Sequence, residues 1–390
     1  MRQALEGSQA IAQAVSRCRP GVVAAYPITP QTHIVENISK LVADGDLKTE
    51  LVSVESEFSA ASVVLGSACA GSRSYTASSS QGIMLMSEVL YNISGLRVPV
   101  VLTCANRAVG APLSIWNDHQ DSMAVRDSGW IQLYCVDNQE AVDTTIQAFR
   151  ISEETEIPVM VCMDGFILTH TLEVVDIPDQ ALVDKYLPPF AFKRILDPKQ
   201  PISIGTLVAP DFFAEVRHSQ HQAMLKSEKA IIEADRDWKK LTRRGYGGLL
   251  SEKGPKDAKV GVMTLGSIGG TLAEALDTQP PRRKTKLINL RCFRPLPVAA
   301  IQKACEGLTD LIVAERAISP GLGGIVGNEI RAALAGMKKA PKVHNVAVGL
   351  GGRDVPLETL NDLVDWAKTA PDTSFSVFDA KLDKLPKEDR

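Results

Sequence analysis

Short apolar runs alternate with longer amphipathic stretches from residue 21 to about residue 164. This alternation is typical of βαβ units, which build a mainly parallel sheet. An unbroken apolar run such as 99–105 indicates a strand buried on both faces, whereas the spacing of apolar positions in 140–153 indicates a helix. The pattern predicts strands at 21–26, 51–55, 73–77, 99–105, 131–136 and 157–163.

An irregular region separates this pattern from a second one like it. Residues 165–255 contain Pro-rich connections, a charged helical stretch at 221–242, and a glycine-rich, charged segment after it, which is typical of an exposed domain boundary. We interpret the region as an extension of the first domain that leads into a linker. Beyond it the pattern predicts strands at 259–265, 286–292, 310–315 and 343–348, and helices near 269–277, 297–306, 323–336 and 357–368.

Two α/β domains are therefore predicted. Residues 1–250 form the first with its linker, residues 257–370 form the second, and 371–390 are a charged, peripheral tail. A length of 390 residues agrees with two domains of roughly 100–200 residues each.

The charge balance argues against nucleic acid and anionic membranes as partners. There are 43 Lys+Arg and 46 Asp+Glu residues, which gives a formal net charge of −3. The N-terminus lacks the apolar core of a secretory signal, and no stretch approaches the roughly 20 apolar residues of a membrane span. We expect a cytoplasmic protein that binds a small molecule or another protein.

Cysteine and histidine spacing predicts no metal centre within this chain. The 7 cysteines are scattered singly, without a C-x-x-C pair, so no iron–sulfur cluster is expected. Those in strand-like runs, such as Cys104 and Cys162, are interpreted as small buried hydrophobes in a reducing compartment. The 6 histidines, His119 and His170 among them, show no metal-ligand spacing.

Four polar segments each leave the end of a predicted strand. Carboxyl ends of parallel strands share one edge of a sheet, where open α/β folds bind their ligands. A hydroxyl, a carboxylate, a polar glycine turn and an arginine are therefore expected to face one crevice. The four segments are Tyr26–Thr32, Val54–Ala60, Ser78–Gly82 and Asn106–Pro112.

Glu55 and Glu57 flank Ser56 where a strand gives way to a helix that begins near Phe58. A carboxylate there has an ordinary explanation, since the helix dipole stabilises it. The alternative is a proton donor or acceptor in a partly dry crevice, where desolvation raises its pKa. The sequence alone does not separate the two.

Arg107 and Thr29 are further candidates on neighbouring loops. Arg107 follows an apolar strand and precedes an apolar loop, a setting suited to clamping a carboxylate. Its alternative is a structural salt bridge with Asp118 or Asp121. Thr29 lies between two prolines, which either position its hydroxyl for a ligand or simply form a turn and helix start.

Two glycine turns follow predicted strands. Ser78–Gly82 is typical of an anion-binding strand-to-helix turn, but it lacks the Gly-Lys-Ser/Thr of a Walker loop. For Gly266–Gly270 in the second domain we favour tight packing over nucleotide binding.

Taken together, seven segments resemble the α subunit of 2-oxoacid:ferredoxin oxidoreductases, and within that family the likeness is greatest to the pyruvate enzyme. The likeness covers nearly the whole chain in order. It implies a domain that binds the pyrimidine side of thiamine diphosphate, followed by a domain like the C-terminal domain of transketolase. The segments are Tyr26–Pro30, Glu55–Glu57, Ser80–Gly82, Asn106–Ala108, Ile115–Asp118, Arg126–Trp130 and Gly349–Asp354.

The resemblance also implies roles for single residues. In that family a glutamate hydrogen-bonds the aminopyrimidine and promotes the tautomer that deprotonates the thiazolium carbon; Glu57 matches it, with Glu55 as the competitor. Ser80 and Gln81 match the cofactor-binding turn. Thr29 and Arg107 match the residues that hold the oxo acid, with the arginine pairing its carboxylate.

Half of the expected site is missing from this chain. Thiamine enzymes usually bind diphosphate and Mg²⁺ through Gly-Asp-Gly followed by asparagine. This chain has neither that segment nor a plausible substitute, and its Asp164–Gly165 pair follows methionine. The resemblance implies that a β subunit supplies the diphosphate and Mg²⁺ site with a cluster, and that CoA-binding and ferredoxin-like subunits or domains bring further [4Fe-4S] clusters.

The resulting hypothesis is the α subunit of a hetero-oligomeric pyruvate:ferredoxin oxidoreductase of anaerobic metabolism. It would convert pyruvate and CoA to acetyl-CoA and CO₂, pass electrons to ferredoxin, and be inactive alone. One alternative is the same chemistry on 2-oxoisovalerate or 2-oxoglutarate, because one or two methylenes in a pocket change discrimination by only about 1–3 kcal/mol. The other alternative is a non-catalytic scaffold subunit.

Overall fold

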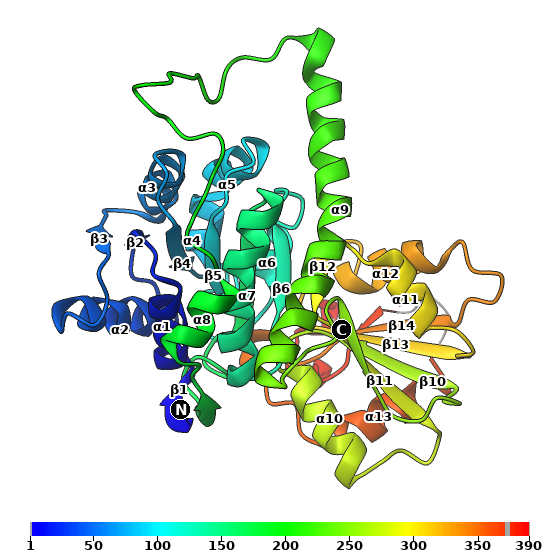
Figure 1. Ribbon diagram of the computed structural model, residues 1–390. Coiled ribbons are helices and arrows are strands. Elements are labelled where there is room, and N and C mark those ends of the chain that lie inside the picture. Colours follow the sequence, from blue (N-terminus) through cyan, green and yellow to red (C-terminus); the bar gives the residue numbers. More distant parts are fainter. Residues whose placement is uncertain (1, 371–374, 390) are drawn as a thin grey trace. The chain divides into compact units, whose positions relative to one another are not determined.

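The computed structural model describes residues 2–370 and 375–389. This part of the chain forms two compact units (Figure 1). Unit 1 runs to Ser251 and includes Leu290–Pro297, and unit 2 comprises Glu252–Asn289 and the described residues from Val298 onward.

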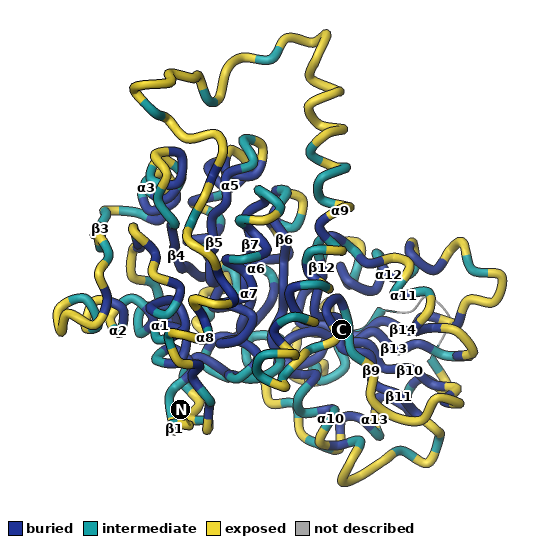
Figure 2. The backbone as a smooth tube through the Cα atoms, viewed as in Figure 1, coloured by how far each residue is buried: buried dark blue, intermediate teal, exposed yellow. Residues whose placement is uncertain are grey.

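Unit 1 is built on a 7-stranded sheet in the order β12-β6-β7-β5-β4-β2-β3. All neighbours are parallel except β12 and β6. Every residue of β4 to β7 is buried, as the unbroken apolar runs predict (Figure 2). The strands are β2 (Val22–Ala25), β3 (Glu50–Ser53), β4 (Ser74–Ser78), β5 (Val101–Asn106), β6 (Ile131–Tyr134), β7 (Val159–Asp164) and β12 (Cys292–Arg294).

Helices supply the remaining core of unit 1, where the buried faces of α1, α7 and α9 meet. All the cysteines are buried and unpaired, as expected of small hydrophobes. The helices are α1 (Gly7–Cys18), α2 (Thr32–Ala43), α3 (Glu57–Cys69), α4 (Ser80–Leu85), α5 (Ser87–Gly95), α6 (Gln120–Ala124), α7 (Asn138–Thr155), α8 (Gln180–Tyr186) and α9 (Pro210–Thr242).

Two features of unit 1 were not predicted. A small antiparallel sheet joins β1 (Arg2–Glu6) to β8 (Leu172–Asp176). The helix expected at 221–242 begins at Pro210, and residues 211–219 are all exposed, in the part of α9 that extends away from the sheet (Figure 2). Within the described residues, no helix is both long and apolar enough to cross a membrane.

Unit 2 contains a 6-stranded sheet in the order β15-β14-β13-β10-β11-β9. Its central strands are parallel and almost wholly buried. The strands are β9 (Leu250–Lys253), β10 (Val260–Thr264), β11 (Thr285–Leu290), β13 (Asp310–Glu315), β14 (Lys342–Ala347) and β15 (Phe375–Val377), and the helices are α10 (Ile268–Thr278), α11 (Val298–Ala304), α12 (Ile325–Leu334), α13 (Thr359–Trp366) and the short η1 (Leu350–Gly352), η2 (Leu382–Lys384) and η3 (Lys387–Asp389).

The structure corrects two sequence predictions. The strand predicted at 286–292 ends at Leu290, and the chain then returns to unit 1 as β12, which is antiparallel to β6. The tail is not wholly peripheral, because β15 pairs with β14. The predicted start of the tail, at 371–374, lies outside the described residues.

Arg291, fully buried between β11 and β12, holds the returning segment in place. Its Nε lies 3.2 Å from Glu140 Oε1, and its Nη1 donates to the Gly248 carbonyl at 2.9 Å. Its Nη2 donates to Thr144 Oγ1 at 2.8 Å and to Gln147 Oε1 at 3.0 Å. The guanidinium therefore neutralises a buried carboxylate on α7.

Replacing Arg291 with methionine is expected to destabilise unit 1 by about 3–5 kcal/mol, because Glu140 then keeps a buried charge without a partner. Burial already raises the pKa of Glu140 to about 7. Without Arg291 the folded-state pKa moves further above the unfolded one, so the loss of stability should grow as the pH rises from about 6 to about 8.

Urea unfolding followed by the fluorescence of the buried Trp130 and Trp238 measures this loss. The matched control is Arg236→Met, which removes an exposed ion pair with Asp237 and should cost less than about 1 kcal/mol. Equal losses in the two variants would contradict a stabilising part for Arg291.

Candidate active site

Four loops at one edge of the unit 1 sheet carry the predicted site residues. They follow β2, β3, β4 and β5, whose parallel pairing brings their carboxyl ends to that edge. The chain leaves β2 for the edge strand β3 and returns on the other side of β2 as β4. Open α/β sheets bind ligands at such a change of direction.

Arg107 lies just beyond the end of β5 and is only 7% exposed. Its Nη1 donates to the Thr29 carbonyl at 2.8 Å, and its Nε donates to the Ser114 carbonyl at 3.2 Å. Within the described part of the chain its guanidinium forms no ion pair; Asp121 instead accepts the backbone N–H of Arg107 at 3.0 Å. The predicted alternative, a salt bridge to Asp118 or Asp121, is therefore wrong.

Burial lowers the pKa of Arg107, and the charge of Asp121 opposes that shift. Nη2 makes no hydrogen bond to any described residue, whereas Nη1 and Nε are both fixed by carbonyl groups. A guanidinium oriented in this way, and without a carboxylate of its own, suits an anionic ligand.

Thr29 is exposed on the loop between β2 and α2. Its carbonyl oxygen accepts the bond from Arg107 described above, so the two predicted substrate residues lie in contact. No described residue hydrogen-bonds the Thr29 hydroxyl, which leaves it available to a ligand.

Asp121, at the start of α6, hydrogen-bonds both the turn after β4 and the loop after β5. Its fully buried carboxylate accepts the backbone N–H of Ser80 at 2.9 Å and that of Arg107 at 3.0 Å. The Asn106 amide and the Ser122 backbone N–H donate to its other oxygen at 2.8 and 2.7 Å. Burial raises the pKa of Asp121, and these four donors counteract the rise.

Ser80 and Gln81 form the turn from β4 into α4. Ser80 has a φ of +48°, in the left-handed region that non-glycine residues rarely adopt. Its buried hydroxyl donates to the Ala108 carbonyl or to the amide oxygen of Gln81. Ser80 therefore holds the turn against the Arg107 loop, while the half-buried Gln81 lies against Gly110.

Glu57 is the first residue of α3 and is 7% exposed. A Cβ added to Gly82 would lie 2.7 Å from Glu57 Oε1 and 2.3 Å from Ser78 Oγ. Within the described residues the Glu57 carboxylate has neither a hydrogen-bond donor nor a cationic partner, and the buried Ser78 hydroxyl also lacks a partner. Unlike the Ser78 hydroxyl, the Glu57 oxygens are not fully enclosed, so water or a ligand can reach them and supply the donor.

Glu55 occupies a different environment. It is exposed, and its Oε1 accepts the hydroxyl of Ser59 at 2.5 Å. This hydrogen bond lowers the pKa of Glu55. Its neighbour Ser56 caps α3 by accepting the Ser59 N–H at 3.2 Å, so Glu55 belongs to the outer surface of the helix start.

The sequence interpretation missed a buried pair beside these loops. His119 Nε2 lies 2.7 Å from Asp164 Oδ1 at the end of β7, and both residues are fully buried. The Nδ1 of His119 has no partner within the described residues. Asp164 follows a strand-like run, but His119 precedes the short helix α6 and follows no strand directly, so no local signal in the sequence indicates their contact.

The structure thus brings the predicted residues together. Contacts connect Thr29 to Arg107, the Ser80–Gln81 turn to the Arg107 loop, and Gly82 of that turn to Glu57. Only Glu55 lies apart from these contacts, on the outer surface. The Arg107 guanidinium, which forms no ion pair with a described residue, can bind an acid. The Glu57 carboxylate, which has no partner among those residues, can exchange a proton.

Comparison with known proteins places this geometry in a family. Residues 13–236 match the family model described as pyruvate flavodoxin/ferredoxin oxidoreductase, thiamine diphosphate-binding. Residues 258–360 match that of pyruvate:ferredoxin oxidoreductase core domain II.

The chain belongs to the pyruvate flavodoxin/ferredoxin oxidoreductase family. It is 42% identical to pyruvate synthase subunit PorA of Methanosarcina barkeri, over 97% of this chain and 96% of the other. It is 44% identical to PorA of Methanothermobacter thermautotrophicus, over 92% and 94%. Ketoisovalerate oxidoreductase subunit VorA of Pyrococcus abyssi is 36% identical over 98% and 96%.

Two solved structures share the fold. The 2-oxoglutarate:ferredoxin oxidoreductase of Magnetococcus marinus superposes with a TM-score of 0.71 and 20% identity, covering 93% of this chain and 65% of that one. A split-gene transketolase superposes with a TM-score of 0.54 and 12% identity, over 94% and 99%. The predicted fold class, a thiamine diphosphate-binding domain followed by a transketolase C-terminal-like domain, is confirmed. This family member is an oxidoreductase subunit.

Gly82→Ala is expected to lower the turnover of the assembled oxidoreductase by about 10²-fold, because the new methyl group would displace the Glu57 carboxylate. The control is Gly66→Ala on α3, where a Cβ meets no atom within 4 Å. The control should keep normal turnover, since alanine is more stable than glycine in a helix interior. Normal turnover in Gly82→Ala, measured at saturating substrate, would contradict the importance of this contact.

Proposed function

We propose that this chain is the α subunit of a hetero-oligomeric pyruvate:ferredoxin oxidoreductase. The complex converts pyruvate and CoA to acetyl-CoA and CO₂ and passes electrons to ferredoxin. The observation that carries the proposal is the buried Glu57 carboxylate, which no described residue hydrogen-bonds, in a chain 40–44% identical to pyruvate synthase PorA subunits. The scaffold alternative gains no support, since Glu57, Thr29 and Arg107 are all present.

The surroundings of Glu57 fit thiamine diphosphate. The carboxylate offers an acceptor oxygen beside Gly82, where the missing side chain leaves room at the start of α4. An aminopyrimidine nitrogen would supply the hydrogen-bond donor that the protein does not. When bound, the cofactor provides the electron sink for decarboxylation. Glu57 holds and transfers the proton that the pyrimidine requires.

Arg107 and Thr29 orient the oxo acid. The Arg107 guanidinium, fixed by the carbonyls of Thr29 and Ser114, keeps Nη2 for the substrate carboxylate. The Thr29 hydroxyl, exposed on the adjacent loop, donates to the same substrate. Ser80 and Asp121 are positioning residues, because they fix the turn and the loop without a free polar group for a ligand.

The remaining components of the site belong to partner chains in this proposal. No Gly-Asp-Gly segment exists in the sequence, so a β subunit brings the diphosphate and Mg²⁺ site and a cluster. The CoA-binding and ferredoxin-like subunits bring further [4Fe-4S] clusters. Assembly in the cytoplasm is part of the same proposal.

The sequence identities to the relatives favour pyruvate over larger oxo acids as the substrate. PorA subunits are 40–44% identical to this chain, and VorA subunits are 36% identical. The test is anaerobic affinity purification of the chain with its partners, followed by CoA- and thiamine-dependent viologen reduction with a panel of 2-oxo acids. Activity with 2-oxoisovalerate or 2-oxoglutarate alone would change the substrate and keep the chemistry.

Glu57→Gln in this complex is expected to lower turnover by about 10²–10⁴-fold, because the amide cannot exchange the proton. Assembly, followed by co-purification of the partner chains, should remain normal. The control is Glu55→Gln, which changes an exposed carboxylate two residues away and should keep normal turnover. Loss of turnover in Glu55→Gln alone would transfer the assignment to Glu55.

Arg107→Ala is expected to raise the KM for the oxo acid by roughly 10–100-fold, as the loss of a charge-assisted hydrogen bond predicts. Arg107→Lys should recover only part of this effect, since an ammonium cannot keep both carbonyl bonds and the substrate contact. Steady-state kinetics of the assembled complex provide the measurement. A KM unchanged in Arg107→Ala would exclude its pairing with the substrate carboxylate.

A further inference from the structure

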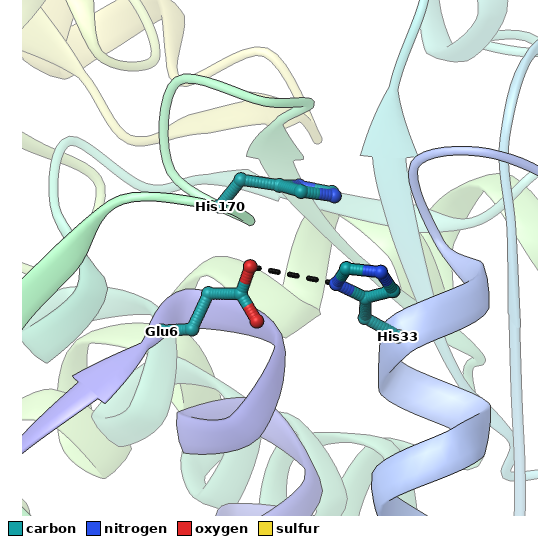
Figure 3. Close-up of side chains that lie close together, drawn as sticks. All are labelled: Glu6, His33 and His170. Carbon is teal, nitrogen blue, oxygen red and sulfur yellow. Dashed lines mark ion pairs between the residues drawn. The ribbon is translucent and has the colours of Figure 1, made fainter.

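Glu6, His33 and His170 converge on the surface of unit 1 although they are far apart in the sequence (Figure 3). Glu6 ends β1, His33 lies in the first turn of α2, and His170 follows β7. One ligand atom of each residue lies within 4.8 Å of the other two. Sequence spacing predicted no metal held by this chain, because a site assembled from three separate elements leaves no local motif.

The hydrogen bonding of the His170 ring is typical of a metal ligand. Its Nδ1 lies 2.7 Å from the Thr169 hydroxyl, which also accepts the Phe166 N–H at 2.8 Å. In the tautomer with its proton on Nδ1, His170 donates to this hydroxyl and offers the lone pair of Nε2 to an ion.

Glu6 and His33 complete the set from the other side. Glu6 Oε1 lies 3.4 Å from His33 Nδ1, and the His33 and His170 rings have their centroids 4.5 Å apart. The side chains are 23% exposed for Glu6 and 43% for His33, so solvent reaches the cluster and both can adjust their rotamers. Metal–ligand bonds of about 2.0–2.2 Å require the three donors to approach one another further, which this freedom allows.

We propose that Glu6, His33 and His170 bind one divalent transition-metal ion, of which Zn²⁺ is the simplest example. Two imidazoles and one carboxylate suit ions such as Zn²⁺, whereas Mg²⁺ and Ca²⁺ prefer all-oxygen sites. Three protein ligands leave coordination positions for water, as the exposure of the cluster permits. None of the three residues is among the candidate active-site residues, and the test of this site does not depend on the proposed function.

The ion would brace the loops of the candidate active site. His33 follows Thr29 by four residues and begins a row of ring contacts with centroids 4.5, 4.7 and 4.5 Å apart, through His170 and Phe166 to Trp116. The Trp116 carbonyl accepts the Ala108 N–H at 3.0 Å, next to Arg107. Fixing His33 and His170 on one ion therefore limits the motion of both substrate loops.

The test is titration of the metal-stripped full chain with Zn²⁺ by calorimetry, with Co²⁺ absorption as the report on ligand type. His218 and His221 lie on α9, outside the Glu6, His33 and His170 cluster, so the His218→Ala/His221→Ala variant is the control. One ion per chain is expected in the wild type and in that control. The expected loss of affinity is about 10²-fold or more in His33→Ala and in His170→Ala.

Two milder variants protect the test against misfolding. Glu6→Gln should weaken binding while the circular dichroism spectrum stays unchanged, and Thr169→Val should weaken it by about 10-fold through the lost hydrogen bond to His170. Zinc affinity unchanged in His33→Ala and His170→Ala would overturn the proposal. Binding that disappears in His218→Ala/His221→Ala would overturn it as well.

Discussion

The carboxylate of Asp121 is the interaction on which the candidate active site depends. It accepts backbone N–H groups from the turn after β4 and from the loop after β5, so one buried charge fixes two neighbouring strand ends at once. The bond to Ser80 also supports a left-handed backbone that costs about 1–3 kcal/mol without compensation. Because Arg107 and Gly82 follow those strand ends, the positions of the guanidinium and of Gly82 beside Glu57 both depend on this carboxylate.

Much of the fold could be predicted because its central strands are buried on both faces. The pattern of apolar runs predicted the ends of β4 to β7, of β10 and of β13 to within two residues. The polar segments that follow the strands of unit 1 contained the candidate site. The edge strands were harder to predict. β12 and β15 have 3 residues each, and their pairing depends on distant segments rather than on local pattern.

The site residues divide in the same way. Glu57 and Arg107 could be predicted because each follows a strand, and family resemblance supplied their roles. Glu55 and Glu57 differ by only two positions, so the sequence could not separate them; helix geometry does, since the cap at Ser56 turns one inward and the other outward. Asp121 and His119 could not be assigned, because their partners come from other strands and hydrogen bonding across a sheet leaves no trace in spacing.

The return of Leu290–Pro297 to unit 1 has a consequence for the order of synthesis. A ribosome releases the first 251 residues well before the strand that completes the edge of their sheet and the arginine that neutralises Glu140. Domains usually fold as they emerge, N-terminal first. Here the N-terminal unit stays unfinished until residue 297 has left the ribosome, so its final folding coincides with the synthesis of the C-terminal unit.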